Sequence, residues 1–408
     1  MISSAVLPEA LHHVRSHMDE MFALIHPGSF YERGIPERHR LIFYLGHVEA
    51  FDWNQIARWT LGKASFHEEF DQLFEAGIDP AFGTLPCDQP SDWPVIDDVL
   101  AYNRRVRKEI DCSIDDAPTD MLHIAIEHRW MHVETTAFIV HHLPQAAKLV
   151  PQLAVSPVSP VSPPPVHEMI EIPEGTATLG CHSSDQFGWD NEFDGFEAIV
   201  PEFSISKYKV TNLQYLQFVH DGAVPPPFWV QRGDAWFLRT MFGECPLPHD
   251  WPVYVSQREA QAYALWAGMA LPTEAQFHRA AYGTMDGEER MYPWGNEAPQ
   301  GFHGNFGLKR WDPVSVTAHP VGESDFGVAQ LVGNGWEWTS TLFHPFEGFT
   351  PHDTYPGYSA RFFDQDHYVV KGAGPQTATC LLRRSFRNWF RPNYPYAHVG
   401  FRCVRNAS

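Results

Sequence analysis

The sequence lacks the marks of several protein classes. No apolar run approaches the ~20 residues needed to span a membrane, and no basic segment followed by an apolar one begins the chain, which argues against a secretory signal. Only six cysteines occur in 408 residues, without Cys-x-x-Cys spacing. We therefore expect reduced thiols and a cytoplasmic protein. A P-loop, a dinucleotide-binding glycine fingerprint and a Gly-x-Ser-x-Gly elbow are also absent.

Positive charge is scarce as well. Against 50 Asp and Glu stand 29 Lys and Arg, for a net charge of −21. Nucleic-acid phosphates and anionic lipids would be repelled, so we expect neither a nucleic acid nor a membrane as partner. What is abundant is apolar: 44% of residues are hydrophobic and 14% aromatic. A chain this long and apolar can bury two cores, and two domains are expected.

The composition changes along the chain. Apolar residues have helical spacing in four segments, 11–25, 40–59, 96–110 and 120–143, which predicts a four-helix bundle over residues 1–152. Residues 155–165 read VSPVSPVSPPP, so residues 153–166 are predicted to be a proline-rich linker. Residues 167–408 are rich in Gly, Pro and aromatic residues, and only 256–269 and 273–282 look helical. The predicted class is α+β, with much irregular structure in the second domain.

Two histidines of one predicted helix carry the most specific signal. His128 and His132 are four residues apart and point the same way, and His47 lies in a second predicted helix. Three imidazoles on one metal leave coordination positions open for O2 or a substrate. The alternative is that they are ordinary core histidines, and zinc is the rival metal. Glu134 points about 200° away from His132, so we expect it to orient a ligand and not to bind the metal.

Other histidines fit surface or packing roles. One group lies near the amino terminus and a pair lies at the end of the fourth predicted helix, and neither has an evident partner on a second helix. They are His12, His13, His17, His141 and His142.

Ordered motifs of the second half resemble the formylglycine-generating-enzyme (sulfatase-modifying factor) fold. They include YKVTN at 208–212, LPTEAQF at 271–277, YPWGN at 292–296, LVGNGWEWT at 331–339 and GFRC at 400–403. The first half resembles a DinB-like bundle with a His-x3-His-x-Glu motif. The two halves together resemble the ergothioneine-type sulfoxide synthases. The fold alone does not settle function, because it hosts enzymes and binding modules alike.

The resemblance implies a reaction and a set of residues. That family uses non-haem iron(II) and O2 to join a sulfur donor to the imidazole C2 of hercynine, which is trimethylated histidine. It implies Fe2+ on His47, His128 and His132. It also implies hercynine binding by Asn388 and Trp389, and a tyrosine segment at the iron site with Tyr355 and Tyr358. We predict Tyr355 as the proton donor.

Two departures from the family pattern bear on the donor. Met131 and Phe390 stand where the subgroup that uses glutamylcysteine has Gln and Asp, so a charged peptide thiol is disfavoured. Residues 74–79 and 85–93 also look closer to the selenoneine synthase branch. We therefore predict a selenoneine synthase that uses a selenosugar donor, with Met131 and Phe390 at the substrate. The alternative is an ergothioneine-type sulfoxide synthase that uses cysteine or a related thiol.

Two other functions remain to be weighed. A metal-stabilised binding protein without catalysis is the remote alternative. A formylglycine-generating enzyme requires two cysteines five residues apart, but this chain has Cys380 and Ser385 at those positions. That activity is excluded, and Cys380 is expected to be a small buried hydrophobic residue.

Overall fold

The computed structural model describes residues 6–76, 84–151, 162–182 and 187–407. The chain divides into two compact units, Met1–Val155 and Ser156–Ser408. Most of the predicted linker, 153–166, lies outside the described residues, so its conformation stays a prediction. No disulfide bond joins any of the six cysteines. Over the described ranges, no helix combines the length and the apolar character that crossing a membrane requires.

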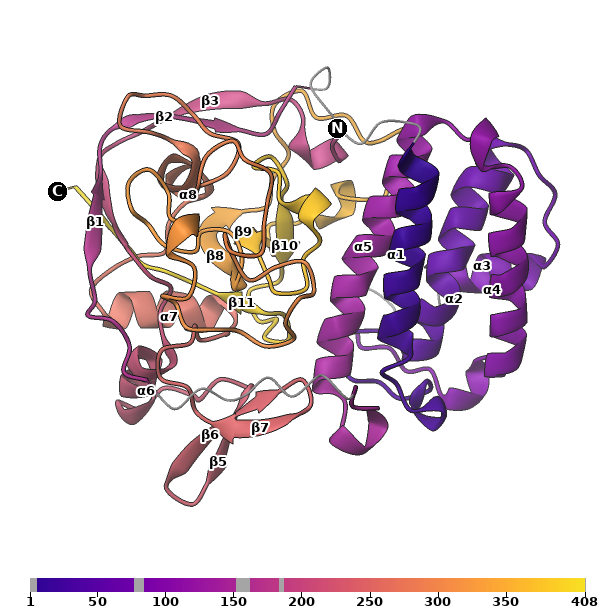
Figure 1. The fold of residues 1–408 in the computed structure, drawn as a ribbon, viewed down its shortest axis with the longest axis horizontal. Helices are drawn as coiled ribbons and strands as arrows, with labels where there is room; N and C mark the ends of the chain where they lie inside the picture. The colour runs from indigo at the N-terminus through magenta and orange to yellow at the C-terminus, as the bar shows by residue number, and fades with distance from the viewer. Residues whose placement is uncertain (1–5, 77–83, 152–161, 183–186, 408) are drawn as a thin grey trace. The chain divides into compact units, whose positions relative to one another are not determined.

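The first unit is helical (Figure 1). Its long helices are α1 (Leu7–Phe22), α2 (Leu41–Asp52), α4 (Ile96–Asp111) and α5 (Thr119–His142), and α2 continues into a π-helix, η3 (Trp53–Thr60). Helix α5 packs against α1 and α2, and α2 packs against α4. Short 3-10 helices lie between them, η2 (Pro27–Ser29), η4 (Pro90–Asp92) and η5 (Ile114–Asp116), and a further one, η6 (Gln145–Ala147), follows α5.

The four predicted helices are present, but the first begins earlier than expected and a fifth is added. Helix α1 starts at Leu7 with Pro8 in its first turn, a position where the missing proline N–H costs no hydrogen bond. Helix α3 (Glu68–Ala76) was not predicted. Its Phe70 and Phe74 are buried, and it packs against α2. The sequence of α3 is short and acidic, so its apolar pattern is weak. Its two buried apolar residues are nevertheless four apart, which is the spacing of one helical face.

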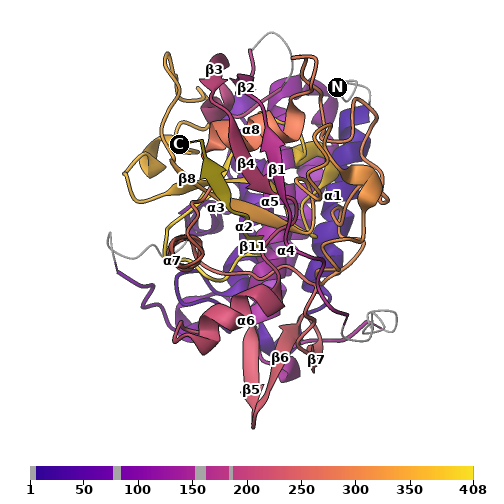
Figure 2. The same cartoon turned by 90° about the vertical axis from the view of Figure 1, so that its left-hand side faces the viewer.

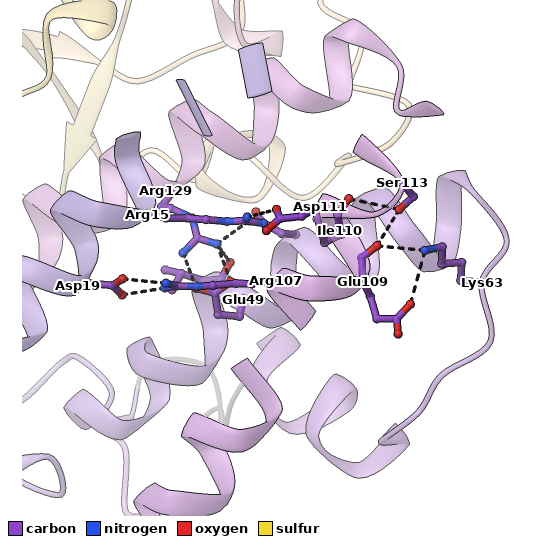
Figure 3. A network of polar contacts seen from close by, with 12 residues as sticks. Arg15, Asp19, Glu49, Lys63, Arg107, Glu109, Ile110, Asp111, Ser113 and Arg129 are labelled. Carbon is purple, nitrogen blue, oxygen red and sulfur yellow. Dashed lines mark hydrogen bonds and ion pairs between the residues drawn. The ribbon is translucent and has the colours of Figure 1, made fainter. Parts of the chain in front are cut away.

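A network of buried charges ties the four long helices together (Figure 3). Arg129 of α5 is fully buried and pairs with Glu49 of α2 at 2.9 Å and with Asp52 at 2.5 Å. Arg107 of α4 joins Glu49 at 2.7 Å and the exposed Asp19 of α1 at 2.7 Å. Burial favours a neutral Glu49, but Arg129, Arg107 and Arg15 outweigh it and lower the pKa of Glu49 to about 2. The network therefore holds ionised groups inside the bundle.

Over its described residues, the second unit combines four small sheets with three α-helices. A four-stranded sheet has the order β10-β9-β8-β11, and β1-β4-β12, β2-β3 and β5-β6-β7 form the others. All neighbours are antiparallel except β11 and β8. Figure 2 shows β5, β6 and β7 as a ribbon at one end of this unit. The strands are β1 (Met169–Ile172), β2 (Gly175–Leu179), β3 (Phe196–Val200), β4 (Phe203–Ser206), β5 (Trp229–Arg232), β6 (Ala235–Thr240), β7 (Gly243–Pro246), β8 (Gly335–Leu342), β9 (Tyr368–Ala373), β10 (Asn388–Phe390), β11 (Val399–Gly400) and β12 (Val404–Asn406).

Capping boxes begin all three helices of this unit. Helices α7 (Gln257–Trp266) and α8 (Glu274–Tyr282) match the two predicted helical segments, with Ser256 and Thr273 as caps. Helix α6 (Asn212–His220) was not predicted, although Thr211 and Gln214 form the same box. Helix α8 lies against β2, and its Phe277 is fully buried in the core. Four 3-10 helices of the described residues, η7 (Asp190–Glu192), η8 (Pro320–Gly322), η9 (Ala360–Phe362) and η10 (Thr379–Leu381), lie in the loops of this unit.

Candidate functional site

Three imidazoles converge inside the first unit. His47 comes from α2, and His128 and His132 come from adjacent turns of α5. The Nε2 atom of His132 lies 3.2 Å from Nε2 of His47 and 3.1 Å from Nε2 of His128. Among the described residues, these three form the one group of three or more His, Cys, Asp or Glu side chains whose ligand atoms lie within 4.8 Å of one another. The sequence placed these histidines on two helices, and the structure brings them together.

A backbone carbonyl of α3 orients one of these rings. Nδ1 of His47 lies 2.6 Å from the carbonyl oxygen of Phe74. Because a carbonyl oxygen can only accept, Nδ1 carries the proton and donates it. The lone pair of His47 is then on Nε2, which faces the other two rings. This partner was invisible in the sequence, because a carbonyl belongs to every residue and the helix that presents it was not predicted.

Aromatic rings enclose the cluster. Phe43 stacks on His47 with ring centroids 4.7 Å apart, and Phe51 stacks on His128 at 3.5 Å. The Tyr44 ring lies 5.7 Å from the ring of His132. Burial, and then the neighbouring imidazoles, lower the pKa values of His128 and His132 well below the ordinary range. Both rings are therefore neutral at physiological pH, which is the form that binds a metal.

The distances within the cluster fit the ligands of one ion. Metal–nitrogen bonds of about 2.1 Å place two ligand nitrogens about 3.0 Å apart at roughly 90° and about 3.4 Å apart at a tetrahedral angle. The observed 3.1 and 3.2 Å lie between these values. Three neutral lone pairs this close repel one another unless a cation or a shared proton lies among them. The site therefore suits a divalent metal, and imidazole alone does not distinguish iron from zinc.

Glu134 and Met131 lie on the same helix as the histidines. The Glu134 side chain is buried but lies outside the three-imidazole group. Met131 is half-buried and directly precedes His132. Near the amino terminus, His13 and His17 pack against each other and against Trp130, with centroid distances of 4.4 Å for the pair and 5.0 Å from His17 to Trp130. The roles of Glu134 and Met131 remain predictions.

In the second unit, the predicted substrate residues belong to one aromatic cluster. Tyr358 is buried and stacks on Trp189 with centroids 4.0 Å apart, and it meets the half-buried Trp389 at 5.5 Å. Tyr355 lies 6.0 Å from Tyr358 and 6.5 Å from Trp189. Burial raises the pKa of Tyr355, opposed by Arg361 and reinforced by Asp190, so its phenol keeps its proton at neutral pH. Trp189, which sequence reasoning missed, is the centre of this cluster.

Strand β10 carries the three other predicted residues of this unit. Asn388 is half-buried, and its Oδ1 accepts a hydrogen bond from the Trp389 backbone at 2.8 Å. Phe390 is buried, with its ring stacked on Tyr394 at 5.2 Å. The structure thus gives Phe390 a packing partner within its own unit. Its contact with a substrate stays a prediction.

The pair of positions that distinguishes formylglycine-generating enzymes has a different role here. Ser385 donates a hydrogen bond to the buried carboxylate of Glu192 at 2.7 Å, and Arg383 pairs with the same carboxylate at 2.5 Å. Cys380 is only half-buried, so the expectation of a buried residue was wrong. It lies in the short helix η10, directly after the exposed Thr379. A serine hydroxyl bound to a carboxylate cannot supply the second thiol.

Known proteins match both units. Residues 155–407 match the family model of the sulfatase-modifying factor enzyme 1-like domain. The chain is 33% identical over 358 residues to the hercynine oxygenase of Mycolicibacterium smegmatis, covering 79% of this chain and 80% of that protein. It is 29% identical over 431 residues to ergothioneine biosynthesis protein 1 of Schizosaccharomyces pombe, covering 94% of this chain and 54% of the relative.

This chain thus spans about half the length of that fungal relative, and the same holds for its counterpart in Neurospora crassa, of which 55% is covered. Among solved structures, PvdO from Pseudomonas aeruginosa aligns with 59% of this chain and 94% of its own length, at 20% identity and a TM-score of 0.44.

Proposed function

Because the chain belongs to the ergothioneine-type sulfoxide synthase family, we propose that it is an O2-dependent, non-haem iron(II) oxidoreductase acting on hercynine. The proposed reaction joins a sulfur donor to the imidazole C2 of hercynine. The observation that carries the proposal is the three-imidazole group of His47, His128 and His132. The name of the M. smegmatis relative, a hercynine oxygenase, supports the choice of substrate.

The overall reaction balances without a further reductant. The C2–H bond of hercynine and the S–H bond of the donor break, a C–S bond forms, and one oxygen atom of O2 becomes the sulfoxide oxygen. The other oxygen atom leaves as water with the two hydrogens. A ferrous ion would supply the one-electron chemistry that O2 needs to react with closed-shell substrates.

Residues of both units have proposed roles in binding the metal and the substrate. In the first unit, the Phe74 carbonyl fixes the tautomer of His47, and Phe43 and Phe51 stack on the rings of His47 and His128, the residues that would hold the iron, and exclude water from them. In the second unit, the aromatic faces of Tyr358 and Trp389 suit a quaternary ammonium group, which cannot donate a hydrogen bond. The Asn388 amide suits the imidazole or the carboxylate of the substrate.

Tyr355 is proposed as the group that holds and delivers a proton. Its phenol is kept protonated by burial, so it can donate to an oxygen species or to the reacting imidazole. Tyr358 is packed on Trp189 and is less free to change position. The stacking therefore favours Tyr355 for proton transfer and Tyr358 for holding the substrate.

A selenium donor is the second candidate. Its support is the apolar pair Met131 and Phe390, which offers no charged group to a peptide thiol. The named relatives act in ergothioneine biosynthesis and on hercynine, so they support the sulfur reaction and give no support to selenium. The sulfur reaction is therefore the main proposal, with cysteine or a related small thiol as donor.

One experiment tests the proposal and the choice of donor. The purified chain is loaded with Fe2+ without oxygen and mixed with hercynine and either cysteine, glutamylcysteine or a selenosugar. O2 uptake is followed after mixing, and products are identified by mass spectrometry. Histidine in place of hercynine, and Zn2+ in place of Fe2+, serve as controls. Hercynine-dependent O2 uptake with one donor is expected. No uptake with any donor would overturn the proposal and favour a non-catalytic binding protein.

A further inference from the structure

A short turn of the second unit lies between the segments that carry the proposed substrate residues. It is η7 (Asp190–Glu192), preceded by Trp189. The Trp189 ring stacks on Tyr358, and Ser359 Oγ donates a hydrogen bond to Asp190 Oδ1 at 2.5 Å. On another side, Arg387, which directly precedes Asn388, donates to the backbone oxygen of Asn191 at 3.3 Å. The turn is thus fixed against both the tyrosine segment and strand β10.

Two polar side chains of this turn are buried without their full set of hydrogen bonds. Asp190 is 3% exposed and Asn191 is 1% exposed. Among the described residues, Asp190 Oδ2 and both side-chain atoms of Asn191, Nδ2 and Oδ1, have no hydrogen-bond partner. A buried acceptor or donor without a partner is unfavourable, so native proteins rarely retain one without a reason. For the Asp190 carboxylate, a cation beside the turn supplies such a reason, because it compensates a buried negative charge without a hydrogen bond.

The surroundings of Asp190 favour a cationic ligand. In the described part of the chain, Asp190 forms no ion pair with a lysine or an arginine, and the neighbouring group whose charge acts on it is His352. Its charge nevertheless acts on Tyr355, whose pKa it helps to raise. Trp389 is half-buried and meets Tyr358, which stacks on Trp189, the residue before Asp190. A carboxylate beside aromatic faces is the combination that binds a quaternary ammonium group.

We propose that the Asp190 carboxylate binds the trimethylammonium end of the substrate and so determines the preference for a betaine over an imidazole compound that has no ammonium group. This inference rests on the proposed function, because it takes hercynine as the substrate. Asp190 is a binding residue for the cationic group. The aromatic rings of Tyr358 and Trp389 lie against the methyl groups, and Asp190 supplies the opposite charge.

Burial of Asp190 agrees with this role. Burial raises the pKa of Asp190, and hydrogen bonds from Ser359 and from the His352 and Asn191 backbones, together with the charge of His352, oppose that change. The carboxylate is therefore less well stabilised without a cation than with one. A permanently charged ammonium ion close to the carboxylate would compensate the lost hydration of the anion.

The test measures binding without turnover. The full chain is loaded with Fe2+ under argon, and its affinities for hercynine and for 3-(imidazol-4-yl)propionate, which lacks the ammonium group, are measured by calorimetry. The variant is Asp190→Asn, which keeps an oxygen to accept from Ser359. Asp353→Asn is the matched control, because it removes the same charge from an exposed side chain near Tyr355. Unfolding temperatures of both variants check that the second unit stays folded.

We expect Asp190→Asn to weaken hercynine binding by about tenfold or more, as loss of a desolvated charge partner does, and to leave the affinity for the propionate within about twofold. Asp353→Asn should change neither the affinity for hercynine nor the affinity for the propionate. An equal loss for both ligands would overturn the assignment to the ammonium group, and unchanged hercynine binding would overturn the role of Asp190. If the wild-type chain did not bind hercynine, the proposed function itself would be rejected and this inference with it.

Discussion

Replacing Arg129 by methionine tests whether the buried charge network positions the histidine cluster. Arg129 directly follows His128, and its guanidinium donates to the backbone oxygen of Val48, the residue after His47, at 2.7 Å. It also donates to Glu49 and Asp52. One side chain thus joins the two helices that carry all three imidazoles, within one residue of a predicted ligand on each.

The magnitude follows from what the substitution leaves behind. Glu49 keeps Arg107 at 2.7 Å, but Asp52 keeps only Arg15, 3.9 Å away. Removing one partner from a buried ion pair costs about 3–5 kcal/mol, mostly because the other charge stays buried. We expect Arg129→Met to lower the free energy of opening of α2 and α5 by about that amount at neutral pH. Metal affinity should fall by about tenfold, because the spacing of α2 and α5 is no longer fixed.

The pH dependence gives an independent check. Burial, opposed by Arg129 and Arg15, raises the pKa of Asp52 above its usual value, and loss of Arg129 should raise it further. A carboxyl group whose pKa is higher in the folded protein favours folding as the pH falls through that value. The contribution of Glu49 has the opposite sign and is lost only below its ordinary value of 4.5. The stability that Arg129→Met loses relative to the wild type should therefore be smaller at pH about 5 than at pH about 7.

Hydrogen exchange of peptides from α2 and α5 measures the change in the free energy of opening within the first unit. Titration with Fe2+ or Co2+ measures metal affinity. Arg104→Met is the matched control, because Arg104 is an exposed arginine of α4. The reasoning would be refuted if Arg129→Met lowered the free energy of opening by less than about 1 kcal/mol. It would also be refuted if the stability difference between this variant and the wild type grew as the pH falls.

Three further predictions concern the two clusters. His132→Ala should lose both bound iron and turnover, and a normal iron content would reject His132 as a ligand. Tyr355→Phe should retain iron but slow or divert the reaction, and unchanged rate and products would remove Tyr355 from proton transfer. Gly46→Ala should cost about 1–3 kcal/mol and weaken metal binding, because the added methyl group overlaps the Phe74 ring, whose residue orients His47. Normal metal affinity in the Gly46→Ala variant would show that Phe74 does not position His47 for metal binding.

The sequence predicted those parts of the molecule that follow from local spacing. Helical periodicity located the helices of His47, His128 and His132, and the i, i+4 rule placed two of the rings on one face. The missed helix α6 had a readable signal, since Thr211 and Gln214 form a capping box, but its apolar pattern is too short to stand out.

Other features depend on tertiary structure. The Phe74 carbonyl reaches His47 only because α3 packs on α2, and neighbours far apart in sequence set that contact. Arg129 looks like an interruption of an apolar helix until Glu49 and Asp52 are placed beside it. Likewise, the Trp189–Asp190 turn lacks any motif, and the residues that fix it come more than 150 positions later.

The hydrogen bond between Phe74 and His47 has a thermodynamic consequence for α3. This helix contributes no metal ligand, yet its last turn sets which nitrogen of His47 is available. By linkage, an ion held at His47 must stabilise the ordered form of α3 to the same degree that α3 strengthens the binding of the ion. Proteolytic cleavage near residues 68–76 should accordingly become slower as the metal concentration rises, so a protease can report on occupancy of a site that it never touches.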